Sequence, residues 1–242
     1  MANHRIYVSD LTPQLGAAAA ASPGLEIVGE EAKHAVRVKR LAVGDPVILM
    51  DGRGRTLEGP ISEIAKDRRS GEWTLRVSTA AGIEVHPKPA REVHVVAAAP
   101  QGDRLDEMID GLSQVGATRW CPLLCRRAVV DPRPTKFDRL DRIATEAMKQ
   151  CGRSWKLEIG DAVALKNIRT GPSTVVADAS GEPCGLLPAG VGPLLLVVGP
   201  EGGFAPEELE LLRRSGCTIS RFGPHILRIE TAAIVAAAHL CR

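Results

Sequence analysis

The spacing of apolar residues divides the chain into two parts. In residues 1–85, short apolar runs alternate with polar turns. Residues 47–50 and 56–64 flank an Asp51-Gly52 turn, a pattern typical of a β-hairpin. Further strands are predicted at residues 5–8 and 73–79, with a helix over residues 30–40. We therefore predict that residues 1–85 form a small β-barrel domain.

From residue 91 onward, predicted strands alternate with predicted helices. The strands are expected at residues 93–99, 118–124, 173–177, 194–198 and 217–222, and the helices at residues 103–115, 137–151, 206–214 and 226–240. Such alternation predicts an α/β domain over residues 91–242, with a mostly parallel sheet and helices on its faces. The last helix is nearly uncharged, so we expect it to be buried on several sides, with a second subunit as one candidate covering surface.

Charge is balanced over the whole chain but not within it. The 242 residues include 31 Lys and Arg against 29 Asp and Glu, so overall electrostatic steering toward nucleic acid is weak. Residues 119–156 nevertheless carry a clear excess of basic side chains. This excess fits phosphate contacts, and a salt-bridged, solvated helix face is the alternative.

Cysteine spacing and hydropathy narrow the class of protein. The six cysteines form no CxxC pair and have no histidine spacing typical of a zinc site, so we expect free thiols and no metal. No apolar run is long enough to span a membrane, and the first residues lack the apolar core of a signal peptide. These features predict a cytoplasmic protein that does not associate with membranes.

Two glycine- and proline-containing loops carry the strongest functional signal. Residues 199–203 (Gly-Pro-Glu-Gly-Gly) directly follow the apolar run 194–198, and Gly223-Pro224 follows the next predicted strand. The carboxyl ends of parallel strands share one edge of a sheet, where ligands commonly bind. Taken alone, either loop is also compatible with an ordinary strand-to-helix turn. The dinucleotide, Walker and nucleophile-elbow motifs are absent from the sequence.

The two loops resemble the VGPEGG and LGxxILRxETA motifs of the RsmE family, the 16S ribosomal RNA uridine-N3 methyltransferases of the SPOUT superfamily. Residues 4–8, 34–45 and 146–153 give supporting matches. The resemblance implies an N-terminal PUA-like RNA-binding barrel and a C-terminal SPOUT domain with a trefoil knot. It also implies S-adenosyl-L-methionine as cofactor, a homodimer, and 16S rRNA or the 30S subunit as substrate. General topology rules disfavour knots, so the knot rests on the resemblance alone.

Candidate site residues follow from the loops and from the basic stretches. Cofactor binding is predicted for Gly199, Pro200, Glu201, Gly202, Gly203, Phe222, Gly223, Ile226, Leu227, Arg228 and Thr231. RNA binding is predicted for Arg5, Arg37, Arg40, Arg126, Arg127 and Arg153.

The predicted reaction suggests roles for three charged residues. Uracil N3 must lose its proton, so negative charge spreads to O2 and O4 in the transition state, where Arg228 is a candidate stabiliser. Arg228 could equally anchor the loops by pairing with Glu201 or Glu230. Either glutamate is a candidate proton acceptor, and the assignment of the base stays open.

The chain departs from the family pattern at several positions. Residues 110–117 replace the usual QKATELGV, His225 replaces the usual Arg before Ile-Leu-Arg, and Phe222 replaces a Leu. The first departure puts RNA or dimer contacts of that helix in question. Two alternatives therefore remain: a SPOUT-type methyltransferase with another target, such as a ribose 2′-hydroxyl, and a non-catalytic rRNA-binding assembly protein.

Overall fold

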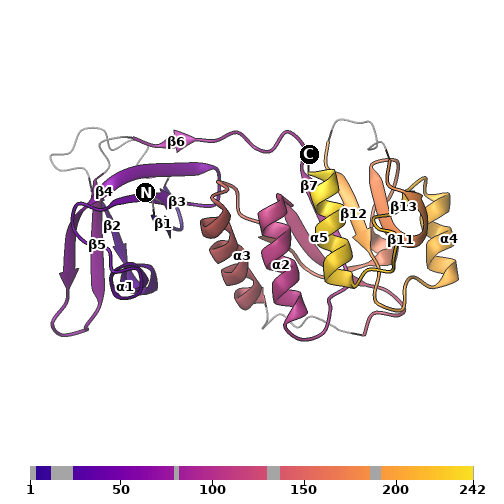
Figure 1. Cartoon of the computed structure of the whole chain (residues 1–242), viewed down its shortest axis with the longest axis horizontal. Coiled ribbons are helices and arrows are strands. Elements are labelled where there is room, and N and C mark those ends of the chain that lie inside the picture. Colours follow the sequence, from indigo (N-terminus) through magenta and orange to yellow (C-terminus); the bar gives the residue numbers. More distant parts are fainter. Residues whose placement is uncertain (1–3, 12–23, 79–81, 130–136, 186–191, 242) are drawn as a thin grey trace. The chain divides into compact units, whose positions relative to one another are not determined.

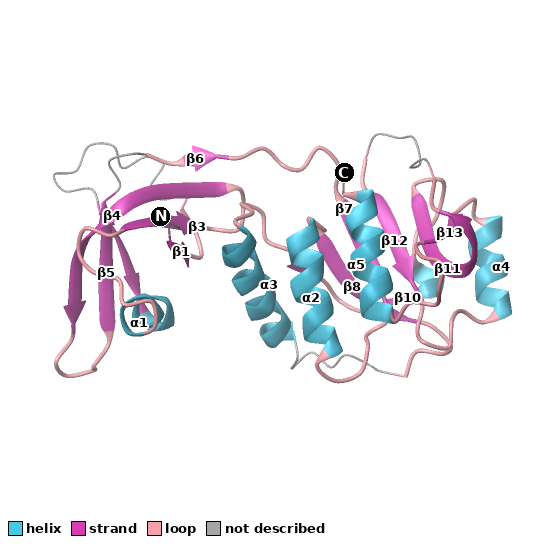
Figure 2. Cartoon of the chain, viewed as in Figure 1, coloured by secondary structure: helices cyan, strands magenta, loops and turns pink. Residues whose placement is uncertain are grey.

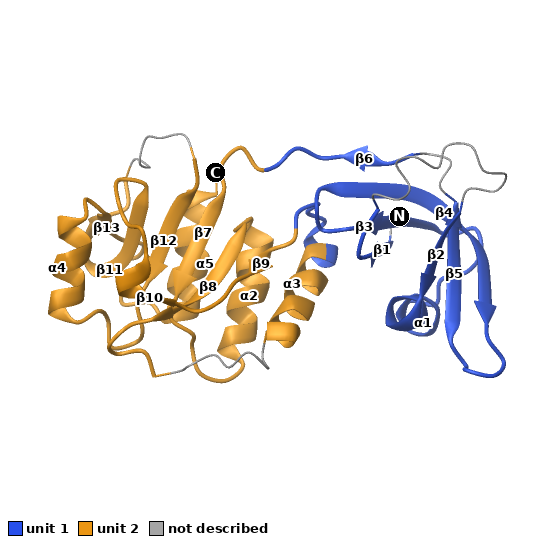
Figure 3. Ribbon diagram, turned by 180° about the vertical axis from the view of Figure 1, so that it is seen from behind, with its two compact units in different colours: residues 1–88, 149–155 blue, residues 89–148, 156–242 orange. Residues whose placement is uncertain are grey.

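A computed structural model describes residues 4–11, 24–78, 82–129, 137–185 and 192–241 (Figure 1). The chain forms two compact units (Figure 3). The first comprises Met1–Lys88 together with Lys149–Trp155, and the second comprises Pro89–Met148 and Lys156–Arg242. The domain limits predicted from the sequence did not assign residues 149–155 to the first unit.

The first unit is a mostly antiparallel sheet with one helix. Its elements are β1 (His4–Tyr7), β2 (Gly24–Val28), α1 (Gly29–Arg37), β3 (Pro46–Met50), β4 (Arg55–Lys66), β5 (Trp73–Ser78) and β6 (Glu84–Val85). The strand order is β1-β3-β4-β5-β2, with β6 also paired to β4. The predicted β3–β4 hairpin is confirmed, with Met50 opposite Thr56. Helix α1 packs on β5 and β2 over an aliphatic core.

Residues 149–155 belong to the first unit because of specific polar and aromatic contacts. Arg5 Nη1 donates to the Lys149 carbonyl oxygen at 3.0 Å. The Trp155 ring packs so closely against Gly54 that a Cβ there would lie 2.5 Å from it. Trp155 Nε1 also donates to the Pro87 carbonyl oxygen at 2.9 Å. Hydrophobic periodicity carries no information on contacts of this kind.

The second unit contains a parallel sheet. Its elements are β7 (Val93–Ala97), α2 (Arg104–Val115), β8 (Arg119–Leu124), α3 (Phe137–Cys151), β9 (Glu158–Ile159), β10 (Val163–Ala164), η3 (Leu165–Asn167), β11 (Thr174–Pro183), β12 (Leu194–Val198), α4 (Pro206–Arg214), β13 (Thr218–Arg221) and α5 (Ile229–Leu240). The strand order is β10-β8-β7-β12-β11-β13, with β9 also paired to β8, and every pairing is parallel. The predicted α/β class with a parallel sheet is confirmed.

Helices α2, α3 and α5 lie along one face of the central strands (Figure 2). Leu196 and Val198 of β12 join a core with residues of these helices, whereas Val197 joins a second core with Leu212 of α4 and with Phe204 of the preceding loop. Because successive side chains of a strand point to opposite faces, a continuous apolar run is buried on both sides. This explains the uninterrupted sequence of β12.

The final helix starts later than its sequence pattern predicted. Helix α5 begins at Ile229 rather than at residue 226, because Arg228 before it has extended backbone angles. No described helix is long and apolar enough to cross a membrane.

Candidate functional site

A cavity of about 470 Å³ opens beside the middle of β11 and the loops that follow β12 and β13. Its lining comes from Ala177, Asp178, Ala179, Val198, Gly199, Pro200, Glu201, Gly202, Gly203, Arg221, Phe222, Gly223, Pro224, His225, Ile226, Leu227, Ile229 and Ala232. A volume of this size lies within the roughly 300–1,000 Å³ typical of small-molecule sites.

Strand register explains why three separated segments meet at this cavity. Ala177 of β11 lies opposite both Val198 of β12 and Ser220 of β13. All three strands are parallel, so the residues after these three positions lie toward the same carboxyl edge. Asp178 is the next residue of β11, where the register of this strand with β13 shifts, and it lines the cavity with both glycine loops.

The structure favours glycine at two positions of the first loop. Gly203 has φ +66°, in the left-handed region that other residues adopt at a cost, and its N–H donates to the Pro200 carbonyl oxygen at 2.8 Å. A Cβ on Gly199 would lie 3.0 Å from the Phe204 ring. Gly202 has no such restriction, since its nearest neighbour would be Arg127 Cδ at 3.5 Å.

The second loop presents an aromatic ring and an exposed aliphatic side chain. Phe222 packs edge-to-face with His239 of α5, with ring centroids 6.0 Å apart. Ile226 is 87% exposed. The cavity thus combines backbone polar groups with apolar surface, which suits a ligand that carries both characters.

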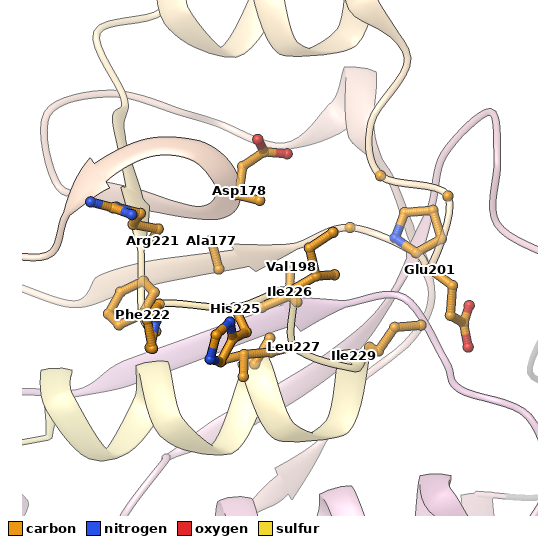
Figure 4. Close-up of a pocket in the computed structure, with 18 residues that line it drawn as sticks. Ala177, Asp178, Val198, Glu201, Arg221, Phe222, His225, Ile226, Leu227 and Ile229 are labelled. Carbon is orange, nitrogen blue, oxygen red and sulfur yellow. The ribbon is translucent and has the colours of Figure 1, made fainter.

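Charged side chains lie on different sides of the cavity. Figure 4 shows Glu201 on the side opposite to Arg221 and Phe222, with Asp178 above Ala177. Asp178 Oδ1 accepts hydrogen bonds from the Ser180 N–H at 2.9 Å and from the Ser180 hydroxyl at 2.6 Å. These bonds orient the carboxylate and leave Oδ2 without a partner among the described residues.

Most of the predicted cofactor-binding residues line the cavity. These are Gly199, Pro200, Glu201, Gly202, Gly203, Phe222, Gly223, Ile226 and Leu227, whereas Arg228 and Thr231 are absent from the lining. The sequence analysis missed Asp178, Arg221 and the neighbouring residues of β11. No motif marks them, and only the register of β11 against β12 and β13 could have identified them.

The three candidate catalytic residues occupy different environments. Glu201 is exposed and lines the cavity. Arg228 is exposed at the N-terminus of α5, and no described residue forms an ion pair with it. Glu230 lies in the first turn of α5 and is 7% exposed, and its Oε2 has no hydrogen-bond partner among the described residues. The anchoring pairs of Arg228 with Glu201 or Glu230 are therefore not formed in this structure.

The predicted RNA-binding arginines also differ from one another. Arg37 and Arg40 are exposed at the end of α1 and form no ion pair with any described residue. Arg5 donates to main-chain carbonyls of Lys149 and Gln150. Arg126 pairs with Glu207, and Arg127 donates to the carbonyl oxygen of Gly202. Arg153 is half-buried.

Two segments of the chain match known protein families. Residues 86–241 match the family described as RNA methyltransferase domain, and residues 27–68 match the RNA methyltransferase PUA domain.

Individual proteins agree with these matches. The chain is 30% identical over 236 residues to ribosomal RNA small subunit methyltransferase E of Bacillus subtilis, which covers 89% of this chain and 88% of the relative. It is 28% identical over 246 residues to the protein of the same name from Mycobacterium bovis, which covers 96% of this chain and 88% of the relative.

A solved structure shares the fold. It is a ribosomal RNA small subunit methyltransferase E from Neisseria gonorrhoeae bound to S-adenosyl methionine, with a TM-score of 0.78 at 18% identity over 99% of this chain and 97% of that one. Together, the family match over most of the chain and the similarity to the Bacillus subtilis protein show that this chain belongs to the ribosomal RNA small subunit methyltransferase E family.

Proposed function

We propose that this protein uses S-adenosyl-L-methionine to methylate N3 of a uridine in small-subunit ribosomal RNA. The observation that carries the proposal is the cavity formed by two glycine loops at the carboxyl edge of a parallel sheet, in a chain of this family. The relative from Neisseria gonorrhoeae was solved with S-adenosyl methionine bound. The cofactor supplies an electrophilic methyl group on a positively charged sulfur.

The residues around the cavity fit such a cofactor. Its adenine offers hydrogen-bonding edges that backbone N–H and C=O groups of residues 199–203 and 222–227 can pair. Its ammonium and ribose hydroxyls need acceptors, for which Asp178 and Glu201 are the acidic side chains in the lining. Arg221 is the basic residue suited to its carboxylate.

The positions of the charged residues suggest how the protein assists methyl transfer. The exposure of Glu201 at the cavity supports it as the acceptor of the N3 proton, whereas buried Glu230 does not line the cavity. Arg228 is always charged and pairs with no carboxylate of the described residues, so its guanidinium is available to stabilise the charge developing on O2 and O4. Exposure of Arg228 at the start of α5 supports this role over loop anchoring.

The first unit is proposed to hold the RNA through α1. Arg37 and Arg40 are exposed cations that pair with no carboxylate in the described part of the chain, which suits phosphate contacts. The PUA match over residues 27–68 includes both. Arg5 and Arg126 are already engaged with carbonyls or a carboxylate, so we assign them a smaller part in RNA binding.

A homodimer formed through α5 is also proposed. Thr231, Val235 and Ala238 form an exposed, uncharged stripe on this helix. A hollow beside it is lined in part by Val235, His239 and Cys184, with Arg221 as the charged side chain in its lining. Burial raises the pKa of the Cys184 thiol, which keeps the thiol neutral near pH 7. The uncharged stripe on α5 favours association with a second copy.

Chain connectivity supports the implied knot. The segment 199–205 leaves β12 for α4, which packs on one face of the sheet. From edge strand β13 the chain returns through residues 222–228 to α5, which packs on the other face against α2, β7 and β12. The two segments meet at one cavity, as the passage of a C-terminal segment through a loop requires.

Incubation with small-subunit rRNA and methyl-labelled cofactor, followed by nucleoside analysis, tests the function. We expect label in 3-methyluridine. Label in a 2′-O-methylated nucleoside would replace the proposed target. RNA binding with no transfer to either free rRNA or 30S subunits would favour a non-catalytic assembly protein.

A further inference from the structure

Arg127 contacts the first glycine loop although it lies in a different part of the sequence. Its Nη1 donates to the Gly202 carbonyl oxygen at 2.7 Å and approaches the Phe204 carbonyl oxygen at 3.4 Å. Arg127 lies just beyond the end of β8, and 75 residues separate it from Gly202. A guanidinium is suited to this task because its planar donors can serve two acceptors at once.

These contacts complete the hydrogen bonding of two peptide groups in the loop. In the Gly202–Gly203 peptide, the N–H donates to the Pro200 carbonyl oxygen and the C=O accepts from Arg127. In the Phe204–Ala205 peptide, the N–H donates to Glu208 Oε2 at 2.9 Å and the C=O faces Arg127. Each peptide plane is therefore held on both sides, which restricts its rotation.

The adjacent arginine does not touch the loop in this way. Arg126 pairs through its side chain with Glu207 in the first turn of α4, and its main-chain N–H donates to Glu208 Oε1. Both arginines lie on the surface, yet only Arg127 reaches carbonyl groups of residues 199–205. The chain thus contains a neighbouring residue of the same type that serves as a control.

We propose that Arg127 is a positioning residue that holds the Gly199–Ala205 loop in its cofactor-binding shape. The inference rests on the proposed cofactor site and adds a residue that lies outside the cavity lining. A loop that is already ordered loses less conformational entropy when a ligand binds, so affinity rises without a direct contact. Arg127 thereby acts on cofactor binding rather than on the chemical step.

Calorimetry with S-adenosylhomocysteine and full-length variants tests this role. Arg127→Met should raise the dissociation constant about tenfold, the order expected for the loss of one charge-assisted hydrogen bond. Arg127→Lys should recover part of the affinity, because an ammonium can still reach one carbonyl. Arg126→Met should bind within about twofold of the unmodified protein. In turnover assays, Arg127→Met should raise the KM for cofactor and leave kcat nearly unchanged.

Other outcomes distinguish an error in the proposed cofactor site from an error in the role of Arg127. If the unmodified protein does not bind S-adenosylhomocysteine, the proposed cofactor site itself is wrong. If it binds and Arg127→Met binds equally well, Arg127 does not position the loop. Unchanged cofactor affinity with weaker RNA binding and a smaller salt dependence would make Arg127 a phosphate contact instead. If Arg127→Met fails to fold, the comparison of Arg127→Lys with Arg126→Lys decides, and equal cofactor affinities would overturn the proposal.

Discussion

Lys149 Nζ donates a hydrogen bond to Glu31 Oε1 at 2.9 Å, although the two residues lie 118 positions apart. The Lys149 side chain is 9% exposed and that of Glu31 is 28% exposed. The pair joins α1 to the end of α3 within the first unit. Without Glu31, the charge on Lys149 would lose this hydrogen bond at a site that is largely shielded from water.

Removing the two partners should therefore have unequal effects. Glu31→Gln should lower the free energy of unfolding by about 2 kcal/mol, less than the ~3–5 kcal/mol of a fully buried pair because Glu31 is partly solvated. Lys149→Met should cost less, since it removes the charge and keeps the aliphatic stem. Urea denaturation measures both, and equal losses would contradict this explanation.

Gly203 and Gly202 differ in backbone angle and should differ in how well they tolerate substitution by alanine. Gly203→Ala places a Cβ at φ +66° and should lower stability by about 1–2 kcal/mol and weaken cofactor binding. Gly202→Ala meets only ordinary contacts, so it is the matched control for stability and should unfold at nearly the same temperature as the unmodified protein. Thermal unfolding measures the stability of both variants, and calorimetry measures their cofactor affinity. A greater loss of stability in the Gly202 variant would contradict the role given to the backbone angle of Gly203.

Arg40 is the non-glycine residue with positive φ among the described residues, at 57°. It follows α1 at a place where glycine is usual, so Arg40→Gly should raise stability by about 1 kcal/mol. RNA binding should weaken, because a proposed phosphate contact is lost. Arg40→Asn tolerates the same backbone angle and should weaken RNA binding similarly. Filter binding at several salt concentrations tests this, and unchanged affinity in both variants would remove Arg40 from the RNA surface.

Val235 is 40% exposed on α5, whereas Ala236 is fully buried within one chain. Val235→Glu should produce a monomer that keeps its thermal stability, because a charge enters only the proposed subunit interface. Ala236→Glu should instead unfold the protein. Val85→Glu on β6 is an exposed control of the same chemistry and should leave the oligomeric state unchanged. If sedimentation shows that the protein without substitutions is a monomer, the proposed dimer is ruled out.

Arg228→Lys should separate a catalytic role from a structural one. If Arg228 stabilises charge on uracil O2 and O4, the variant should keep its cofactor affinity and turn over more slowly. Its rate should recover as pH rises, because N3 then deprotonates more readily. A rate defect independent of pH, or lost cofactor binding, would make Arg228 structural.

The sequence alone determined the features that depend on near neighbours in the chain. The Asp51-Gly52 hairpin and the apolar run of β12 were predictable, because turn residues and burial on both faces act over a few positions. The glycine loops were recognisable for the same reason, and most of their predicted residues line the cavity.

Only the tertiary structure decided which distant residues join these loops. The register of β11 against β12 and β13 brings Asp178 to the cavity, and packing after β8 directs Arg127 to the Gly202 carbonyl oxygen. Packing likewise groups Trp155 with the first unit rather than with the domain that the sequence assigned to it. Such contacts depend on strand order and side-chain direction, which are set by the burial of the whole core and leave no local pattern in the sequence.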